Sequence, residues 1–187
     1  MSQVTPNVWS AVKDYSNGTL LGQPDFYISY VGFKLGTWDK EKNEVKVNPN
    51  AKAADKRVRQ AFGYAVDWDQ LNEKIYKGLR FTPTNSGIYP TRSEDYYDKD
   101  GFKFKKDVEK AKKLLDEAGL KDTDGDGLRE DNKGNKLVFN FAFQGGNNYD
   151  QALADTFIKS WKEVGLDVKL VDGKLLSPKD WSTRVQA

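Results

Sequence analysis

The run from residue 137 to residue 171 constrains the fold most strongly. Residues 137–143 read Leu-Val-Phe-Asn-Phe-Ala-Phe, which places four large apolar side chains on one face of a strand. Residues 149–164 then repeat apolar side chains at helical spacing, and residues 167–171 (Asp-Val-Lys-Leu-Val) give a second strand pattern. Strand, helix and strand in this order predict a βαβ-like unit.

Two further segments predict the rest of the sheet and a long insertion. Residues 26–35 are rich in β-branched and aromatic side chains, which predicts a strand in which Gly32 marks a bulge or a close backbone approach. The polar stretch 36–54 predicts a loop insertion that holds a short hairpin around Val45 and Val47.

The helical segments complete the prediction. Apolar residues at helical spacing predict a short helix from Thr5 to Asn17, two helices at an angle within 55–77, and an amphipathic helix over 104–118. Residues 79–103 show much turn chemistry and predict an irregular, aromatic-bearing segment. We therefore expect an α/β fold in a single domain. Its mixed sheet contains the strands near 26–35, 137–143 and 167–171, and the helices at 55–77, 104–118 and 149–164 pack on it.

The composition allows one soluble globular domain and excludes several classes of function. The 187 residues are 37% hydrophobic and 31% charged, which fits neither a membrane span nor a disordered chain. Thirty basic and 28 acidic side chains leave a net charge of +2, so we expect no nucleic-acid partner. The chain has no Cys and no His, which removes thiolate nucleophiles, imidazole bases and the commonest metal ligands. The first residues also lack the features of a signal peptide.

One acidic segment resembles the first half of a calcium loop. Asp122, Asp124 and Asp126 occupy positions 1, 3 and 5 of the motif, and Gly127 occupies position 6. Position 12 is Lys133, where the motif needs a bidentate Glu. We therefore expect a tight Asx/Gly turn between a helix and a strand, and the three Asp residues are only weak metal candidates.

Other motifs favour structural roles. Asp67 and Asp69 lie where a helix must be capped, so we interpret them as caps and not as a glycosidase pair. Neither a Walker pattern nor a strand-linked GxGxxG is present, which argues against a nucleotide enzyme. Trp161 falls on the apolar stripe of its helix and is expected in the core, whereas Trp181 lies in a polar context that favours the surface. We expect no cofactor.

Four sequence blocks together give a specific family signal. Each block is a weak signal alone, but their occurrence in this order is specific. The blocks are Asp55-Lys-Arg-Val-Arg-Gln-Ala-Phe-Gly-Tyr-Ala-Val-Asp-Trp-Asp69, Ala111-Lys-Lys-Leu-Leu-Asp-Glu-Ala-Gly119, Asp124-Gly-Asp-Gly-Leu-Arg-Glu130 and Trp161-Lys-Glu-Val-Gly-Leu-Asp-Val-Lys-Leu170. From about Phe26 to its end, the chain resembles the extracellular solute-binding proteins of oligopeptide and dipeptide ABC importers. Members of this family are considerably longer and close two lobes around a ligand.

The resemblance carries expectations for the whole chain. It implies that residues 1–187 are a partial second lobe of a two-lobed periplasmic-binding-protein-like fold, and that the first lobe and the hinge are missing. It implies capture of extracellular oligopeptides for delivery to a membrane permease, with no bond made or broken. It also implies a cell-surface lipoprotein or a periplasmic location.

The resemblance also implies a ligand-binding site. Trp181 matches a tryptophan that lines the ligand cavity, and the loop after the phenylalanine-rich strand faces the cleft. The loop contributes four candidate residues: Gln144, Asn147, Asn148 and Tyr149. The family's acidic residue that pairs with a peptide α-amine lies beyond the segment matching Asp180–Arg184. Gly32-Phe33-Lys34 departs from the family's Gly-Phe-Asn.

Three alternatives stay open at this point. The same lobe could bind an oligosaccharide or another small solute, because stacking aromatics suit sugars equally well. An enzyme acting on peptides or sugars would need catalytic groups, and the sequence offers neither Cys nor His nor a convincing carboxylate pair. An adhesion or signalling module could keep the fold without transport.

Overall fold

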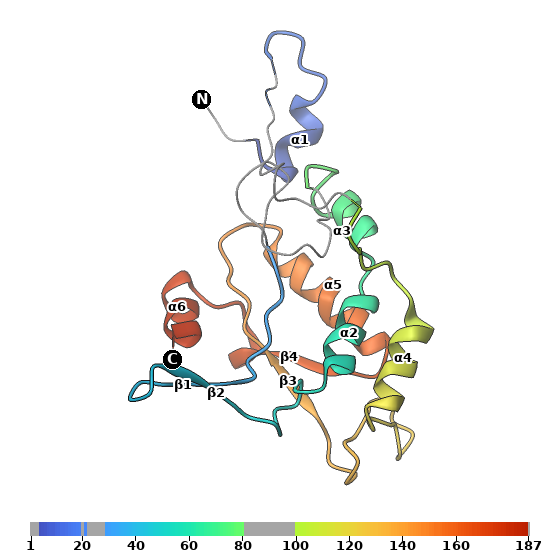
Figure 1. Ribbon diagram of the computed structural model, residues 1–187. Coiled ribbons are helices and arrows are strands. Elements are labelled where there is room, and N and C mark those ends of the chain that lie inside the picture. Colours follow the sequence, from blue (N-terminus) through green and yellow to red (C-terminus); the bar gives the residue numbers. More distant parts are fainter. Residues whose placement is uncertain (1–3, 20, 22–28, 81–99, 187) are drawn as a thin grey trace. The chain divides into compact units, whose positions relative to one another are not determined.

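The computed structural model describes residues 4–19, 21, 29–80 and 100–186 (Figure 1). The chain divides into two units, which are described separately. One comprises Met1–Tyr30 with Trp68–Phe104, and the other comprises Val31–Asp67 with Lys105–Ala187. Within the described ranges, no helix is both long and apolar enough to cross a membrane.

The larger unit contains the predicted βαβ unit. Strand β3 (Val138–Phe141) pairs in parallel with β4 (Asp167–Leu170), and helix α5 (Asp150–Glu163) connects them. The register places Val138 opposite Asp167 and Phe141 opposite Leu170. Gly165, with φ of +86°, ends the helical segment in the left-handed conformation that glycine adopts readily. The alternation of residues 137–143 and the stripe of the following helix therefore predicted this unit correctly.

An aromatic cluster forms the centre of the core. The Trp161 ring stacks on Phe157 at a centroid distance of 5.3 Å and meets Phe141 and Phe62 edge-on at 5.0 and 5.1 Å. Its indole Nε1 donates a hydrogen bond to the Phe62 carbonyl oxygen, at 3.1 Å. Only 1% of Trp161 is exposed, which confirms its predicted place in the core. Phe139 extends the cluster by packing on Phe62.

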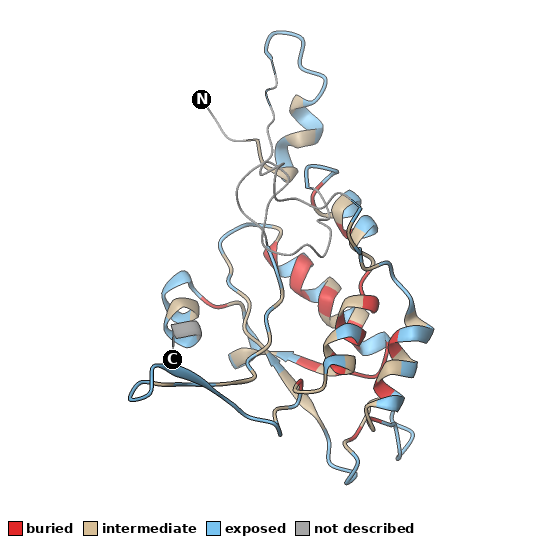
Figure 2. Ribbon diagram, in the orientation of Figure 1, coloured by how far each residue is buried: buried red, intermediate tan, exposed pale blue. Residues whose placement is uncertain are grey.

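Two helices pack together on this core. Helix α2 (Lys56–Tyr64) begins after Asp55, whose carboxylate accepts the Arg57 backbone N–H at 2.8 Å. Helix α4 (Val108–Glu117) begins after Asp107, whose carboxylate caps it in the same way. Both helices turn their apolar stripes inward, and Figure 2 shows the buried residues gathered on α2, α4, α5 and β4. The predicted helix at 104–118 therefore begins a few residues later than expected, where a cap is available.

The smaller unit contains two short helices, α1 (Pro6–Val12) and α3 (Trp68–Lys74). The predicted break within 55–77 is confirmed, because α2 ends at Tyr64 and α3 begins directly after Asp67. Most of the segment predicted to be irregular falls on residues 81–99, which lie outside the described residues.

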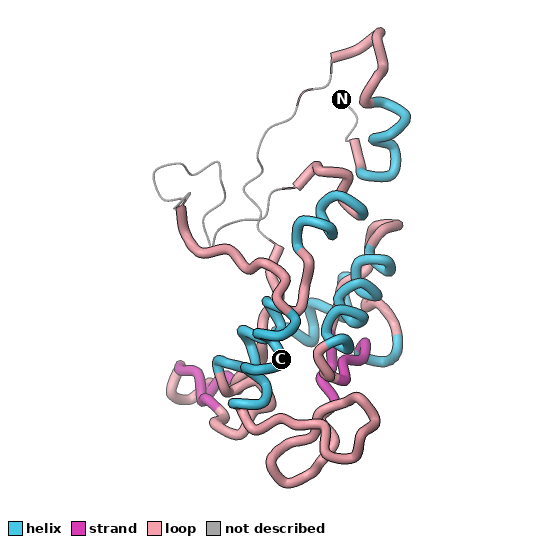
Figure 3. The backbone as a smooth tube through the Cα atoms, turned by 90° about the vertical axis from the view of Figure 1, so that its right-hand side faces the viewer, coloured by secondary structure: helices cyan, strands magenta, loops and turns pink. Residues whose placement is uncertain are grey.

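The strand predicted for residues 26–35 is absent from the described part of this segment. Residues 22–28 lie outside the described ranges, and residues 29–35 form no strand. The Phe33 ring instead packs on Phe62 at 5.1 Å, so this segment contributes an apolar side chain to the core without ladder pairing. In the described part of the chain the strands form two separate two-stranded sheets and not one mixed sheet (Figure 3).

The second sheet is the predicted hairpin. Strand β1 (Gly36–Asp39) pairs antiparallel with β2 (Glu44–Val47), which confirms the hairpin around Val45 and Val47. The Asp39 carboxylate accepts the backbone N–H groups of the two residues that begin the reversal, Glu41 and Lys42. A Cβ at Gly36 would lie 2.3 Å from the Lys46 carbonyl oxygen. A close backbone approach therefore occurs at Gly36 in the hairpin.

Candidate functional site

The two segments predicted to bind ligand are joined by backbone hydrogen bonds. After β3, the chain forms a short parallel bridge in which Gln144 lies beside Leu176. The Leu176 N–H donates to the Phe143 carbonyl at 2.8 Å, and the Gly145 N–H donates to the Leu176 carbonyl at 2.9 Å. Leu176 lies two residues before helix α6 (Pro178–Gln186), which carries Trp181. The loop at 144–149 and helix α6 therefore both begin at this bridge.

Local hydrogen bonds fix the start of α6. The Ser177 hydroxyl donates to the Asp180 carboxylate at 2.7 Å and accepts the Asp180 backbone N–H at 3.1 Å, while the Trp181 N–H donates to the Ser177 carbonyl at 2.9 Å. Arg184 forms an ion pair with Asp172 at 2.8 Å, which ties α6 to the preceding turn. Trp181 is half-buried on this fixed helix, and its indole finds no hydrogen-bond acceptor among the described residues.

In the loop at residues 144–149, Asn147 has a structural contact, and the side-chain amides of two other residues are free. The Asn147 backbone N–H donates to the buried Asp150 carboxylate at 2.7 Å, and its amide Nδ2 lies 3.3 Å from the same oxygen. This contact shapes the entry to α5. Gln144 and Asn148 are exposed, and their side chains form no hydrogen bond with the described part of the protein. Tyr149 is half-buried, and its carbonyl accepts the Leu153 N–H at 3.0 Å.

This arrangement supplies recognition chemistry. Amide side chains donate and accept hydrogen bonds, and a half-buried indole offers an apolar face for stacking. Gln144, Asn148 and Trp181 are therefore available to a ligand, whereas Asn147 acts by holding the loop in shape. The sequence did not reveal the bridge to Leu176, because the pairing joins segments about thirty residues apart.

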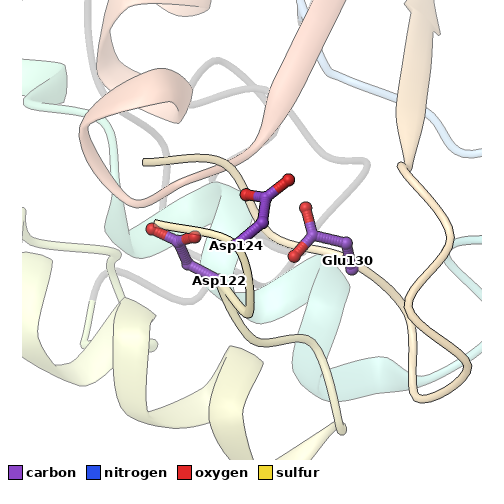
Figure 4. Close-up of side chains that lie close together, drawn as sticks. All are labelled: Asp122, Asp124 and Glu130. Atoms are coloured by element: carbon purple, nitrogen blue, oxygen red, sulfur yellow. The ribbon is translucent and has the colours of Figure 1, made fainter. Parts of the chain in front are cut away.

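The calcium-like segment forms a series of turns closed by its own carboxylates. The two Asp122 oxygens accept the N–H groups of Gly125 and Gly127 at 2.7 and 2.9 Å. Asp124 accepts the Asp126 N–H at 3.2 Å, as expected of Asx turns. Figure 4 shows the carboxylates of Asp122, Asp124 and Glu130 close together. One oxygen of each lies within 4.8 Å of the others. Asp126, and not Glu130, was predicted as the third carboxylate of this group.

A lysine lies among these carboxylates. The Lys136 Nζ lies 2.6 Å from Asp124, 2.5 Å from Asp126 and 3.0 Å from Glu130. These contacts, first the one with Asp124, raise the pKa of Lys136 above its ordinary value. Hydrogen bonds from the Thr123 N–H and hydroxyl, followed by Lys136, lower the pKa of Glu130. The predicted Asx/Gly turn is present, and an ammonium group that the sequence analysis missed balances its charge.

A hollow of about 240 Å³ lies beside β3 in the larger unit. Phe33, Phe139 and Trp161 are among its mainly apolar lining residues, and Lys52 at its rim donates to the Val138 carbonyl at 2.6 Å. Its aromatic walls belong to the core cluster, and none of the predicted ligand-binding residues lines it.

Comparison with known proteins decides the family. The model of the bacterial extracellular solute-binding proteins, family 5 middle region, matches residues 1–185. The chain belongs to this family. Its α/β fold is accordingly that of a solute-binding protein, as predicted.

Two solved structures and one curated relative illustrate the family likeness. The oligopeptide-binding protein OppA of Lactococcus lactis subsp. lactis (strain IL1403) is 33% identical over 175 residues, which are 92% of this chain and 28% of that protein. Lactococcal OppA, solved with an endogenous peptide in the closed conformation, superposes with a TM-score of 0.83 at 28% identity, covering 96% of this chain and 33% of that one. A mannohexaose-bound periplasmic oligopeptide-binding protein of an oligopeptide ABC transporter from Thermotoga maritima superposes with a TM-score of 0.53 at 25% identity. The superposition covers 69% of this chain and 24% of that one.

Proposed function

We propose that this chain is part of the second lobe of an oligopeptide-binding protein, and that its loop at 144–149 and helix α6 contact the peptide. The observation that carries the proposal is the backbone bridge between Gln144 and Leu176, which brings the free amides of the loop to the base of the Trp181 helix. The peptide held by lactococcal OppA supports the ligand class. The chain spans 28% of its curated relative, so the proposed site is one side of a cleft.

The chemistry of these residues suits a peptide of varied sequence. Gln144 and Asn148 can pair with main-chain amides, which every peptide presents, and Trp181 can pack against side chains of different shapes. Closure of the other lobe over the bound peptide would bury these contacts and exclude water. In the longer protein, we propose delivery to a membrane permease from the cell surface or the periplasm, with a lipid anchor in the former case. The protein would bind its ligand without transforming it.

An amide NMR titration of the chain tests the proposal. A mixed oligopeptide pool at millimolar concentration should shift the resonances of residues 144–149 and of α6, because these groups would contact the ligand. Trp181→Ala should weaken these shifts, with roughly a tenfold loss of affinity if the indole is a main anchor. Trp38→Ala is the matched control, since Trp38 is 54% exposed on β1 and should leave the titration unchanged.

The same titration separates the outcomes. Peptide-dependent shifts that persist in Trp181→Ala would show that this helix is not part of the site. Silence with peptides would contradict the proposal that residues 144–149 and α6 contact the peptide.

The alternative ligand is an oligosaccharide, which the mannohexaose-bound relative favours. A cello-oligosaccharide pool should then shift the resonances that peptides leave unchanged, and Trp181→Ala should abolish the response through loss of stacking. A response to sugar alone would assign the site to this second class of ligand.

A further inference from the structure

The loop between α4 and β3 combines a calcium-binding pattern with an internal cation. Three of its carboxylates, Asp124, Asp126 and Glu130, lie within 3.0 Å of the Lys136 Nζ. The ammonium donates hydrogen bonds to Asp124 and Asp126 and forms an ion pair with Glu130. The lysine follows the acidic motif by only a few residues, yet it points back into the centre of the motif.

Two of these carboxylates, Asp124 and Asp126, are among the first ligands that a calcium loop would use. Calcium takes six to eight oxygen ligands, and positions 1, 3 and 5 supply the first of them. Here Asp122 at position 1 accepts two backbone N–H groups, and positions 3 and 5 hold Lys136. A divalent cation at this place would face the ammonium at contact distance, where like charges repel strongly. Lysine and calcium therefore exclude each other.

Glu130 makes the internal cation necessary. Its side chain is 2% exposed. One carboxylate oxygen accepts the Thr123 N–H at 2.8 Å and the Thr123 hydroxyl at 2.7 Å. The other oxygen is buried and has no conventional hydrogen-bond donor in the described structure, and its charge is balanced by Lys136 at 3.0 Å. Loss of the ammonium would leave a buried carboxylate oxygen without compensation, which is costly.

We propose that Lys136 is a built-in counter-ion that takes the place of a divalent cation, so that this loop folds without calcium. The backbone bridges of Glu130 to Lys121 and to Lys136 connect the loop to the start of β3, so the ammonium supports the strand that leads to residues 144–149. Removing the charge of Lys136 would convert the loop into one that calcium stabilises.

Thermal unfolding of the full chain tests this inference. Lys136→Met keeps the length of the side chain and removes its charge. In EDTA the variant should unfold on the order of 5 °C below the unchanged protein. Millimolar CaCl₂ should recover part of this loss, because Asp124, Asp126 and one oxygen of Glu130 would then have lost their cation and could bind the ion. The unchanged protein should unfold at the same temperature in EDTA and in CaCl₂.

Two controls separate this role from general effects of charge. Lys133→Met removes a positive charge at position 12 of the motif, where the side chain is exposed, and should respond to neither solution. Lys136→Arg keeps a cation and should remain insensitive to calcium. Equal unfolding temperatures for Lys136→Met and Lys133→Met in EDTA would overturn the proposal.

A second measurement does not depend on the variant folding well. In an NMR titration of the unchanged protein with CaCl₂, the amides of residues 122–136 should keep their positions, because Lys136 occupies the centre of the loop. Saturable shifts of these amides would show that calcium displaces the lysine, and would also overturn the proposal. Neither result bears on peptide binding at Trp181.

Discussion

Two polar connections flank strand β3, and they use their side chains in opposite ways. The loop before the strand, residues 122–136, binds its carboxylates to backbone N–H groups and to Lys136. The loop after the strand, residues 144–149, fixes Asn147 on Asp150 and leaves the side chains of Gln144 and Asn148 exposed. Both are rich in Gly, Asn or Asp, so composition alone does not distinguish them.

The difference shows how a loop becomes available to a ligand. A polar side chain already satisfied within the protein must break an internal contact before it can bind anything else. An exposed amide exchanges only water for the ligand and so costs less to engage. The side chains of the first loop therefore have a structural role, and those of the second loop form the candidate binding surface.

The largest expected effect comes from removing Arg129 from the first loop. Its guanidinium donates to the Leu120 carbonyl at 2.6 Å and to the Val164 carbonyl at 2.9 Å, and its side chain is 11% exposed. Arg129→Met should lower the free energy of unfolding by about 2 to 4 kcal/mol, because both carbonyls lose their donor. Urea denaturation followed by tryptophan fluorescence measures this change. Gln144→Met in the second loop should stay within about 0.5 kcal/mol, and equal losses would remove the distinction between the loops.

A smaller effect sharpens the comparison within the second loop. Asp150 is 6% exposed and accepts the Asn147 backbone N–H, so Asp150→Ala should cost about 1 to 2 kcal/mol of unfolding free energy. Asn148→Ala should be nearly neutral in the same urea titration. If Asn148→Ala destabilised the chain as much as Asp150→Ala, the Asn148 side chain would have a structural role and would not be spare for a ligand.

The smallest effect is the response of the first loop to acid. Hydrogen bonds, with those from Thr123 first, hold the pKa of Glu130 below its ordinary value of 4.5. A carboxylate with a lowered pKa in the folded state contributes stability above its unfolded pKa, and this contribution disappears as the pH falls through the folded pKa. NMR of the Glu130 side-chain carboxyl should therefore show an inflection below pH 4.5. Thr123→Val should move the inflection upward, and an unchanged inflection would exclude Thr123 as the main cause.

The local signals predicted much of this structure. The helix expected from residue 55 begins after its cap Asp55, and residues 137–171 form the expected βαβ unit, whereas the helix expected over 104–118 begins only after Asp107. The prediction for residues 26–35 was less successful, because a strand pattern shows which residues are apolar but does not show whether a partner strand is adjacent. Phe33 satisfies its apolar character by packing on Phe62 without backbone pairing.

The sequence by itself determined the helices, the hairpin and the acidic turn, because each depends on contacts within a few residues. It also carried the family blocks that indicated a solute-binding protein. Only the tertiary structure decided that Leu176 bridges to Gln144 and that the indole of Trp161 donates to Phe62. It also decided that the side chain of Lys136 turns back among the carboxylates. These contacts depend on how distant segments or long side chains are placed in space, and residue type and local spacing do not encode that placement.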